Sequence, residues 1–175
     1  SICTHKVLFT HENGDEKNKV FPEINGDQVF TKSYLYGHYF IQTCSVLFKN
    51  ENISEFINFL DGFKVGDAPL YYFYSQNGNI GFIDECMAVY RFHNTSFWSS
   101  QDNFSKHIKS IKTLRLLQKK LNIYHSSEFD QHILDYLIVI LNHFYRERDR
   151  FRFIQYLGLS VRYIEGANDK QKEKL

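Results

Sequence analysis

The stretch that decides the fold lies between residues 66 and 93. It contains Gly66-Asp67-Ala68-Pro69-Leu70, then Gly81-Phe82-Ile83-Asp84-Glu85, then Val89-Tyr90-Arg91-Phe92-His93. Asp67 is an N-cap candidate for a helix, because Pro69 follows in the first turn, where its missing N–H has no cost. The stretch predicts an acidic residue at a helix start and a histidine just past a strand.

The residues between these segments predict a helix, a turn and two strands. Residues 70–74 supply the apolar face of the helix that Asp67 would begin, and Asn77-Gly78-Asn79 would end it in a turn. Residues 80–83 and 87–92 are expected to form short strands on either side of Asp84-Glu85. The aromatic cluster Tyr71-Tyr72-Phe73-Tyr74 favours a core position, with stacking on a sugar ring as the alternative.

The first 60 residues predict further α/β elements. Residues 2–9 are expected to form a strand, 11–26 a loop or loose hairpin, 30–39 a short helix and 40–48 a buried strand. Ser54 is a plausible N-cap for another helix. That helix would present four apolar side chains to a core: Phe56, Ile57, Phe59 and Leu60.

After residue 100 the chain becomes helical in character. Residues 101–121 and 128–146 show apolar residues at three- and four-residue steps and contain no glycine, as an antiparallel helix pair requires. Residues 151–164 would add a third helix. We therefore expect an α/β domain over residues 1–100 and a helical extension over residues 101–175.

Composition excludes several classes of protein. The chain has 175 residues, 21 basic against 20 acidic, and 43% hydrophobic residues, so neither a disordered chain nor a nucleic-acid-binding surface is indicated. The apolar runs are far shorter than the roughly 20 residues that span a bilayer. Three cysteines without C-x-x-C spacing favour reduced, partly buried thiols in a cytoplasmic protein.

Taken in order, these segments resemble the acceptor-side half of the catalytic domain of family 2 glycosyltransferases, which have the GT-A fold and invert configuration at the transferred sugar. Residues 66–70 are similar to the motif that holds the catalytic base, and residues 77–85 to the turn and strand after it. Residues 88–93, with 96–99, are similar to the closing segment. Residues 35–48 are similar to the strand and loop on the acceptor side.

The resemblance implies roles for five residues. Asp67 would be the general base for the acceptor hydroxyl, and His93 would help to hold Mn²⁺ or Mg²⁺ on the diphosphate. Thr43 and Trp98 would contact substrate. Arg91 would neutralise charge on the leaving diphosphate, or would instead pair with Asp84 or Glu85.

Two departures from the family pattern limit these expectations. Ala68 stands where the family commonly has an aromatic residue, which puts acceptor stacking at that position in doubt. The strand-loop that holds the nucleotide base and the Asp-x-Asp metal motif are both missing from the sequence, and in the family both lie upstream of the strand expected near Ile2. We therefore expect a C-terminal part of a GT-A domain followed by a helical extension.

The expected function is that of a fragment of an inverting glycosyltransferase, from an enzyme that builds a surface polysaccharide and uses a nucleotide-diphosphate sugar and a saccharide or lipid-linked acceptor. The isolated chain is expected to be inactive. The alternative is a non-catalytic binding or assembly module that self-associates or binds a partner through its helices. Peripheral contact with the inner membrane face is left open, because the basic run from 109 to 120 would suit anionic lipid, although a solvated helix face is favoured there.

Overall fold

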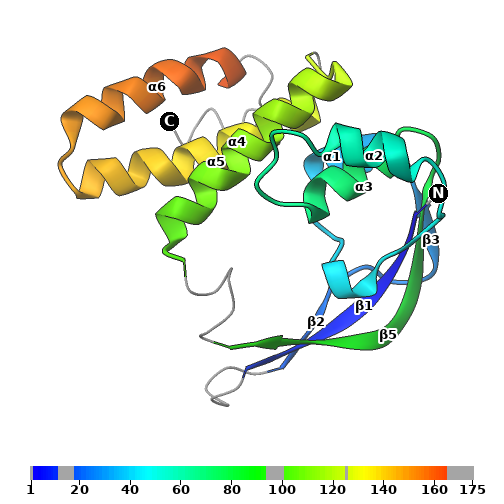
Figure 1. Cartoon of the computed structure of the whole chain (residues 1–175). Helices are drawn as coiled ribbons and strands as arrows, with labels where there is room; N and C mark the ends of the chain where they lie inside the picture. The colour runs from blue at the N-terminus through cyan, green and yellow to red at the C-terminus, as the bar shows by residue number, and fades with distance from the viewer. Residues whose placement is uncertain (1, 12–17, 94–100, 125, 165–175) are drawn as a thin grey trace. The chain divides into compact units, whose positions relative to one another are not determined.

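The computed structural model describes residues 2–11, 18–93, 101–124 and 126–164. It divides into two compact units (Figure 1). Unit 1 contains Ser1–Asp61 and Val65–Gln101, and unit 2 contains Gly62–Lys64 and Asp102–Leu175. The described residues are 53% helical and 21% strand, so the fold class is mixed α/β.

A curled mixed sheet forms the framework of unit 1. Its central strand β1 (Ile2–His11) pairs in parallel with the long strand β5 (Ile80–Phe92) on one side. On the other side of β1 lie two short antiparallel strands, β2 (Lys19–Phe21) and β4 (Leu47–Phe48). Strand β3 (Gln28–Phe30) pairs antiparallel with the start of β5. The expected first strand and the hairpin-like return after it are confirmed.

Strand β5 is one continuous strand, so the prediction of two separate strands is wrong. The irregularity that the sequence suggested is a bulge: His5 pairs with Ile83, but the next residue, Lys6, pairs with Cys86. Asp84 sits in the bulge, where its carboxylate accepts a hydrogen bond from the Gly26 N–H (2.5 Å) and pairs with Lys6. The bulge therefore locks a loop and β1 onto β5 without ending the strand.

Between the strands, the described residues of unit 1 form three α-helices and one short 3₁₀-helix. These are α1 (Lys32–Gly37), η1 (Thr43–Ser45), α2 (Ile53–Phe59) and α3 (Asp67–Ser75). Among the described residues the core contains eleven large side chains from the strands, α1, α3 and the segment before η1: Ile2, Val7, Leu35, Tyr36, Phe40, Ile41, Tyr71, Tyr72, Tyr74, Ile80 and Phe82. The predicted core role of the tyrosine cluster is thus confirmed for Tyr71, Tyr72 and Tyr74.

The prediction of a buried strand over residues 40–48 is wrong. Phe40 and Ile41 are buried, but the chain then turns through η1, and Leu47 is 73% exposed. Gln42 causes the turn, because its carbonyl oxygen accepts hydrogen bonds from both the backbone N–H (2.9 Å) and the hydroxyl (2.8 Å) of Ser45. A serine that bonds to nearby backbone in this way competes with the ladder of a strand.

Two helix starts also differ from their predictions. Helix α2 begins at Ile53 with Asn52 as its N-cap, not with Ser54, because Asn52 adopts the left-handed conformation (φ 58°) that asparagine tolerates. Ile57, expected in a core, is 62% exposed. Gly66 is the N-cap of α3, and Asp67 is its first helical residue, a shift of one position.

The described residues of unit 2 form three helices, and all three predictions are confirmed. They are α4 (Asn103–Leu121), α5 (Ser127–Arg146) and α6 (Arg150–Ile164). Asp102 and Ser126 cap α4 and α5 by accepting the backbone N–H three residues on. The core is drawn from all three helices: Ile111, Leu114, Leu117, Phe129, Ile133, Leu134, Leu137, Ile140, Leu141, Phe144 and Tyr163.

None of the described helices has the length and apolar character needed to cross a bilayer. The three cysteines are unpaired, as expected, but Cys44 and Cys86 are exposed where partly buried thiols were predicted.

Candidate functional site

Asp67, Thr43 and Tyr71 form a hydrogen-bonded group at the start of α3. The Tyr71 hydroxyl donates to Thr43 Oγ1 (3.2 Å), and Thr43 Oγ1 in turn donates to Asp67 Oδ2 (3.4 Å). The other carboxylate oxygen, Asp67 Oδ1, accepts the Ala68 backbone N–H (2.8 Å). Asp67 and Thr43 are exposed, whereas Tyr71 is 4% exposed. The group therefore presents a carboxylate and a hydroxyl to solvent over a buried phenol.

The direction of these hydrogen bonds is fixed by Tyr71. Burial is the main cause that raises the pKa of the Tyr71 phenol, and the nearby Asp67 carboxylate raises it further. The phenol consequently keeps its proton throughout the neutral range and acts as a donor. Because Thr43 Oγ1 accepts from Tyr71, the single proton of Thr43 is left to point at Asp67.

The turn that carries Thr43 is held on the sheet by a buried pair of hydroxyls. Thr4 Oγ1 lies 2.7 Å from Ser45 Oγ, and both residues are buried, at 1% and 3% exposure. Because the Ser45 hydroxyl donates its proton to the Gln42 carbonyl oxygen, the Thr4 hydroxyl is the donor in the bond between Thr4 and Ser45. This hydrogen bond attaches η1 to β1, and so it also positions Thr43, which lies two residues before Ser45.

Cys44 directly follows Thr43, but its thiol is a poor nucleophile. Burial raises the pKa of its thiol, so the thiol form dominates at neutral pH and the nucleophilic thiolate is scarce. The group around Asp67 thus offers acid–base and hydrogen-bonding chemistry.

A row of aromatic rings lies on the sheet of unit 1. We call it the aromatic row; its members come from β1, β2, β5 and the segment after α1: Phe9, His11, Phe21, Tyr39, Tyr90 and Phe92. Phe9 stacks on Phe21 (5.5 Å between ring centroids) and meets the edge of Phe92 (5.2 Å). Tyr39 lies 5.9 Å from Phe21 and is 62% exposed.

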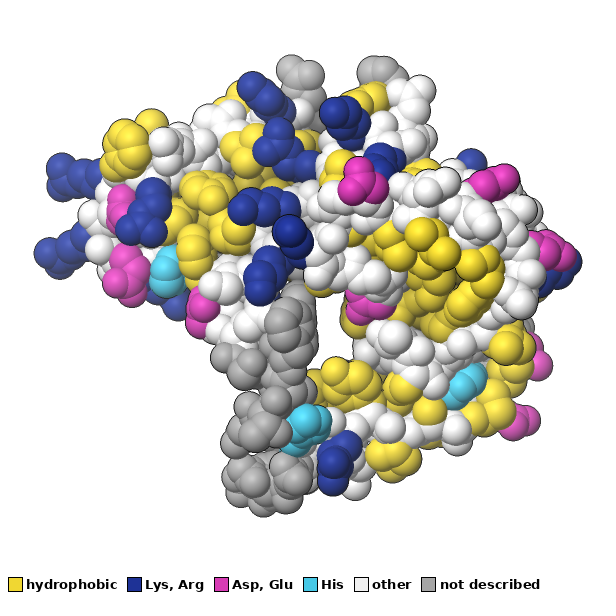
Figure 2. All heavy atoms as spheres, in the orientation of Figure 1, with side chains coloured by type: hydrophobic (Ala, Val, Ile, Leu, Met, Phe, Trp, Pro, Cys, Tyr) yellow, Lys and Arg dark blue, Asp and Glu magenta, His cyan; other side chains and the backbone are white. Residues whose placement is uncertain are grey.

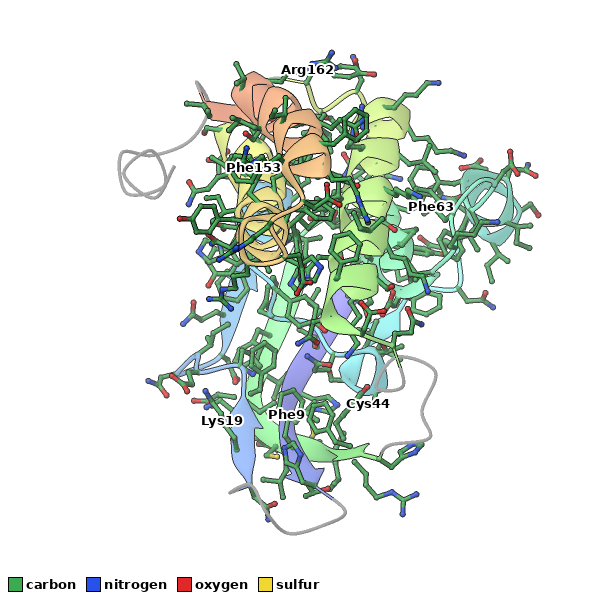
Figure 3. All side chains as sticks on the ribbon, turned by 90° about the vertical axis from the view of Figure 1, so that its left-hand side faces the viewer. Phe9, Lys19, Cys44, Phe63, Phe153 and Arg162 are labelled. Carbon is green, nitrogen blue, oxygen red and sulfur yellow. The ribbon has the colours of Figure 1, made fainter. Side chains whose placement is uncertain are left out.

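Tyr39 is the member of the aromatic row that lies nearest to the Asp67 group along the chain. It precedes Thr43 by four residues, and its phenol makes a minor contribution to the raised pKa of Tyr71. Figure 3 labels Phe9 on β1 and Cys44 on the adjacent turn η1. Except for Tyr39, all members of the row are half-buried, so ring faces or edges remain accessible to a ligand.

Arg91 and His93 lie far along β5 from Asp67. Thr4, which anchors η1, pairs with Phe82 near the start of β5. His93 follows eleven residues later, a path of up to about 36 Å along an extended strand. The structure therefore brings Thr43 to Asp67 but places Arg91 and His93 at the opposite end of β5. Trp98 lies outside the described residues.

No metal-binding group is found in the part of the chain that the structure describes, where no three His, Cys, Asp or Glu side chains gather as ligands would. The metal role of His93 stays a prediction. Asp84, one of the two acids considered as a partner for Arg91, pairs with Lys6, and this hydrogen bond is the main cause that lowers the pKa of its carboxyl. The Asp84 carboxylate therefore stabilises the bulge between β1 and β5.

Two features of the site were missed from the sequence. Tyr71 was expected in the core, with stacking on a sugar ring as the alternative, and its hydroxyl contact with Thr43, which joins segments 28 residues apart, was not foreseen. The aromatic row was missed as well, although Phe9 and His11, like Tyr90 and Phe92, are two residues apart, the spacing that puts side chains on one face of a strand.

Comparisons with family models, with curated proteins and with solved structures found no match for this chain.

Proposed function

We propose that unit 1 binds the acceptor in an inverting glycosyl transfer, with Asp67 as the general base. The observation that carries the proposal is the geometry at Asp67, whose exposed carboxylate is held by the Ala68 N–H and by Thr43. The resemblance of residues 66–70 and 77–93 to family 2 glycosyltransferases supports the same assignment. The GT-A fold itself is part of this proposal.

In the proposed step the acceptor hydroxyl replaces or shares the long Thr43 contact at Asp67 Oδ2. Asp67 takes the hydroxyl proton as the acceptor oxygen forms a bond to the anomeric carbon of the donor sugar, and the bond from that carbon to the diphosphate breaks. Thr43, with its proton released from Asp67, can donate to the same acceptor oxygen or to a neighbouring hydroxyl. Tyr71 keeps Thr43 in the orientation that allows this.

The aromatic row suits a saccharide beyond the reacting hydroxyl. The apolar C–H face of a sugar ring packs on an aromatic face, while its hydroxyls need polar partners at the rim. Tyr39 supplies both an exposed ring and a phenol, four residues before Thr43 in the chain. An extended acceptor would therefore run from Asp67 toward Phe9 and Phe92.

Donor binding is the less supported part of the proposal. No group of three or more His, Cys, Asp or Glu side chains that could hold a metal ion is found among the described residues, and no step of the proposal is routed through Mn²⁺ or Mg²⁺. Arg91 remains a candidate for the charge of a diphosphate. Its place at the far end of β5 requires the donor, or a long acceptor, to bridge the length of the sheet.

Ligand-observed NMR on the whole chain tests acceptor binding with a panel of methyl glycosides of hexoses and N-acetylhexosamines. We expect at least one glycoside to bind, and Asp67→Asn and Thr43→Val to weaken that binding. Asp61→Asn is the matched control, because Asp61 is an exposed aspartate outside the site. Binding that is equal in Asp67→Asn and wild type, or no binding to any glycoside, would overturn the proposal.

The alternative function, a binding or assembly module that acts through its helices, is favoured by one observation. Helix α6 exposes several large apolar side chains, including Phe151 at 73% and Ile154 at 66%. Such a surface calls for a partner. The two functions are separable, because substitutions at Asp67 affect only the first and substitutions on α6 only the second.

A further inference from the structure

Helix α6 carries an apolar face that no described residue covers. Four of its side chains are large, apolar and exposed: Phe151, Ile154, Leu157 and Val161. Their spacing of three, three and four residues puts them on one side of the helix. The opposite side, with Ser160 and Tyr163, is buried in unit 2.

The charges on α6 are all positive. Residues 150–164 contain Arg150, Arg152 and Arg162 and no aspartate or glutamate. By helical geometry, at about 100° per residue, Arg150 and Arg162 border the exposed apolar side at its two ends. Asp149, the acid directly before the helix, caps it by accepting the Arg152 N–H (3.0 Å) and pairs with the Arg152 side chain (2.7 Å).

The wider surroundings of α6 are basic too. Residues 102–175 contain 14 basic and 9 acidic residues, a net charge of +5, whereas residues 1–101 contain 7 basic and 11 acidic, a net charge of −4. Figure 2 shows Lys and Arg side chains standing around hydrophobic ones over the helices of unit 2. The net charge of the whole chain is close to zero, but residues 1–101 carry the negative excess and residues 102–175 the positive excess.

We propose that α6 docks on the surface of an anionic lipid bilayer. An amphipathic helix with an apolar face and arginines at its border lies in the plane of the interface, with the apolar side chains among the acyl chains and the cations at the headgroups. Arginine suits this border because its apolar stem can follow the helix while the guanidinium reaches lipid phosphate.

Two other occupants fit the observations less well. A second copy that paired α6 with α6 would bring together four arginines, Arg150 and Arg162 of each copy, without an acid from either helix. Like charges across an interface oppose association. A nucleic acid would satisfy the arginines, but binding to phosphates gives no reason to expose Phe151 and Ile154. The proposal does not rest on the glycosyltransfer function of unit 1.

Sedimentation of the whole chain with lipid vesicles tests the proposal. One set of vesicles is phosphatidylcholine alone, and the other contains about 30% phosphatidylglycerol to supply the anionic surface. We expect binding to the anionic vesicles and at least tenfold weaker binding to the neutral ones. Absence of binding to anionic vesicles would overturn the proposal.

Variants on α6 locate the binding surface. Phe151→Ser with Ile154→Ser removes apolar contact and should weaken anionic-vesicle binding about tenfold or more, and Arg150→Gln with Arg162→Gln should weaken it to a similar extent. The exposed positions make folding of both variants safe, and circular dichroism checks it. The matched controls are Val139→Ser, an exposed apolar residue of α5, and Lys49→Gln, an exposed cation of unit 1.

The pattern across variants separates the occupants. Loss in both double variants, with both controls unchanged, supports the proposal. Loss in the arginine variant alone indicates a general polyanion site and contradicts insertion of α6. A third outcome would refute the proposal: the chain does not bind anionic vesicles, forms a dimer in sedimentation equilibrium, and becomes monomeric in Phe151→Ser with Ile154→Ser. The apolar face of α6 would then bind a second copy of the chain.

Discussion

The buried hydroxyl pair Thr4–Ser45 gives a sharp test of how the Asp67 group is positioned. Thr4→Val keeps the shape of the side chain and removes its hydroxyl. The Ser45 hydroxyl then loses the hydrogen bond that it accepts at 2.7 Å but still donates to Gln42. A net hydrogen bond contributes about 1 kcal/mol, and a buried acceptor left without a partner costs about 1–3 kcal/mol. We expect Thr4→Val to lower the free energy of unfolding of unit 1 by about 1–3 kcal/mol.

Ser45→Ala should cost more than Thr4→Val, because it removes two hydrogen bonds. The Thr4 hydroxyl is left without a partner, and the Gln42 carbonyl oxygen keeps only the Ser45 backbone N–H. The double variant should cost less than the two single effects together, since the Thr4–Ser45 interaction can be lost only once. Urea unfolding followed by amide hydrogen exchange is the suitable assay, because it reports on unit 1 separately from unit 2. Thr10→Val, on the same strand, is the control. A Thr4→Val effect within about 0.5 kcal/mol of zero, or strict additivity in the cycle, would refute the reasoning.

Three more predictions follow from individual contacts. The pKa of the Asp84 carboxyl is lowered by its hydrogen bonds to Lys6 and Gly26. The stability that Asp84 contributes is therefore present above the unfolded pKa of about 3.9 and disappears as pH falls through the lower folded pKa. Acid titration by circular dichroism should show Asp84→Asn less stable than wild type at pH 7, with the difference in stability shrinking below pH 4. Leu137→Ala, at a fully buried position of α5, should destabilise unit 2 by about 2–5 kcal/mol in urea unfolding, and a loss under about 1 kcal/mol would contradict the described core. Purified chain mixed with nucleotide-diphosphate sugars and Mn²⁺ should release no nucleoside diphosphate in a coupled assay, and steady release that Asp67→Asn abolishes would contradict that expectation.

The helices of unit 2 could be predicted because their signals are local. Ile111, Leu114 and Leu117 repeat at helical spacing on α4, and Asp102 supplies a standard cap. Strand β1 was also predicted, over residues 2–9. Such patterns depend on neighbours in the chain, and packing then follows from them.

The errors in unit 1 have non-local causes or depend on competing hydrogen bonds. Residues 40–48 read as a strand because their composition is apolar, but Ser45 bonds back to Gln42 and turns the chain. The two strands around Asp84 join into one because Lys6 and Gly26, 78 and 58 residues away, hold the bulge together. Neither partner can be found by periodicity along β5.

The candidate site was half predictable. Asp67 and Thr43 were selected by resemblance, and the structure places them 3.4 Å apart between side-chain oxygens. Tyr71 and the aromatic row were not selected, since half-buried aromatic residues look in sequence like any core residue. The distance from Asp67 to His93 depends on the length of β5. The sequence analysis predicted two short strands interrupted at Asp84, so it did not foresee this length.

The most direct test of the central claim is an NMR titration of isotopically labelled chain with the tightest-binding methyl glycoside. The account predicts that the amide signals of Thr43, Ala68 and Tyr71 shift together as one site fills. It also predicts that Asp67→Asn weakens binding about tenfold, because a charge-assisted hydrogen bond is replaced by a neutral one. Shifts confined to other residues, or an unchanged affinity in Asp67→Asn, would contradict a saccharide site at Asp67.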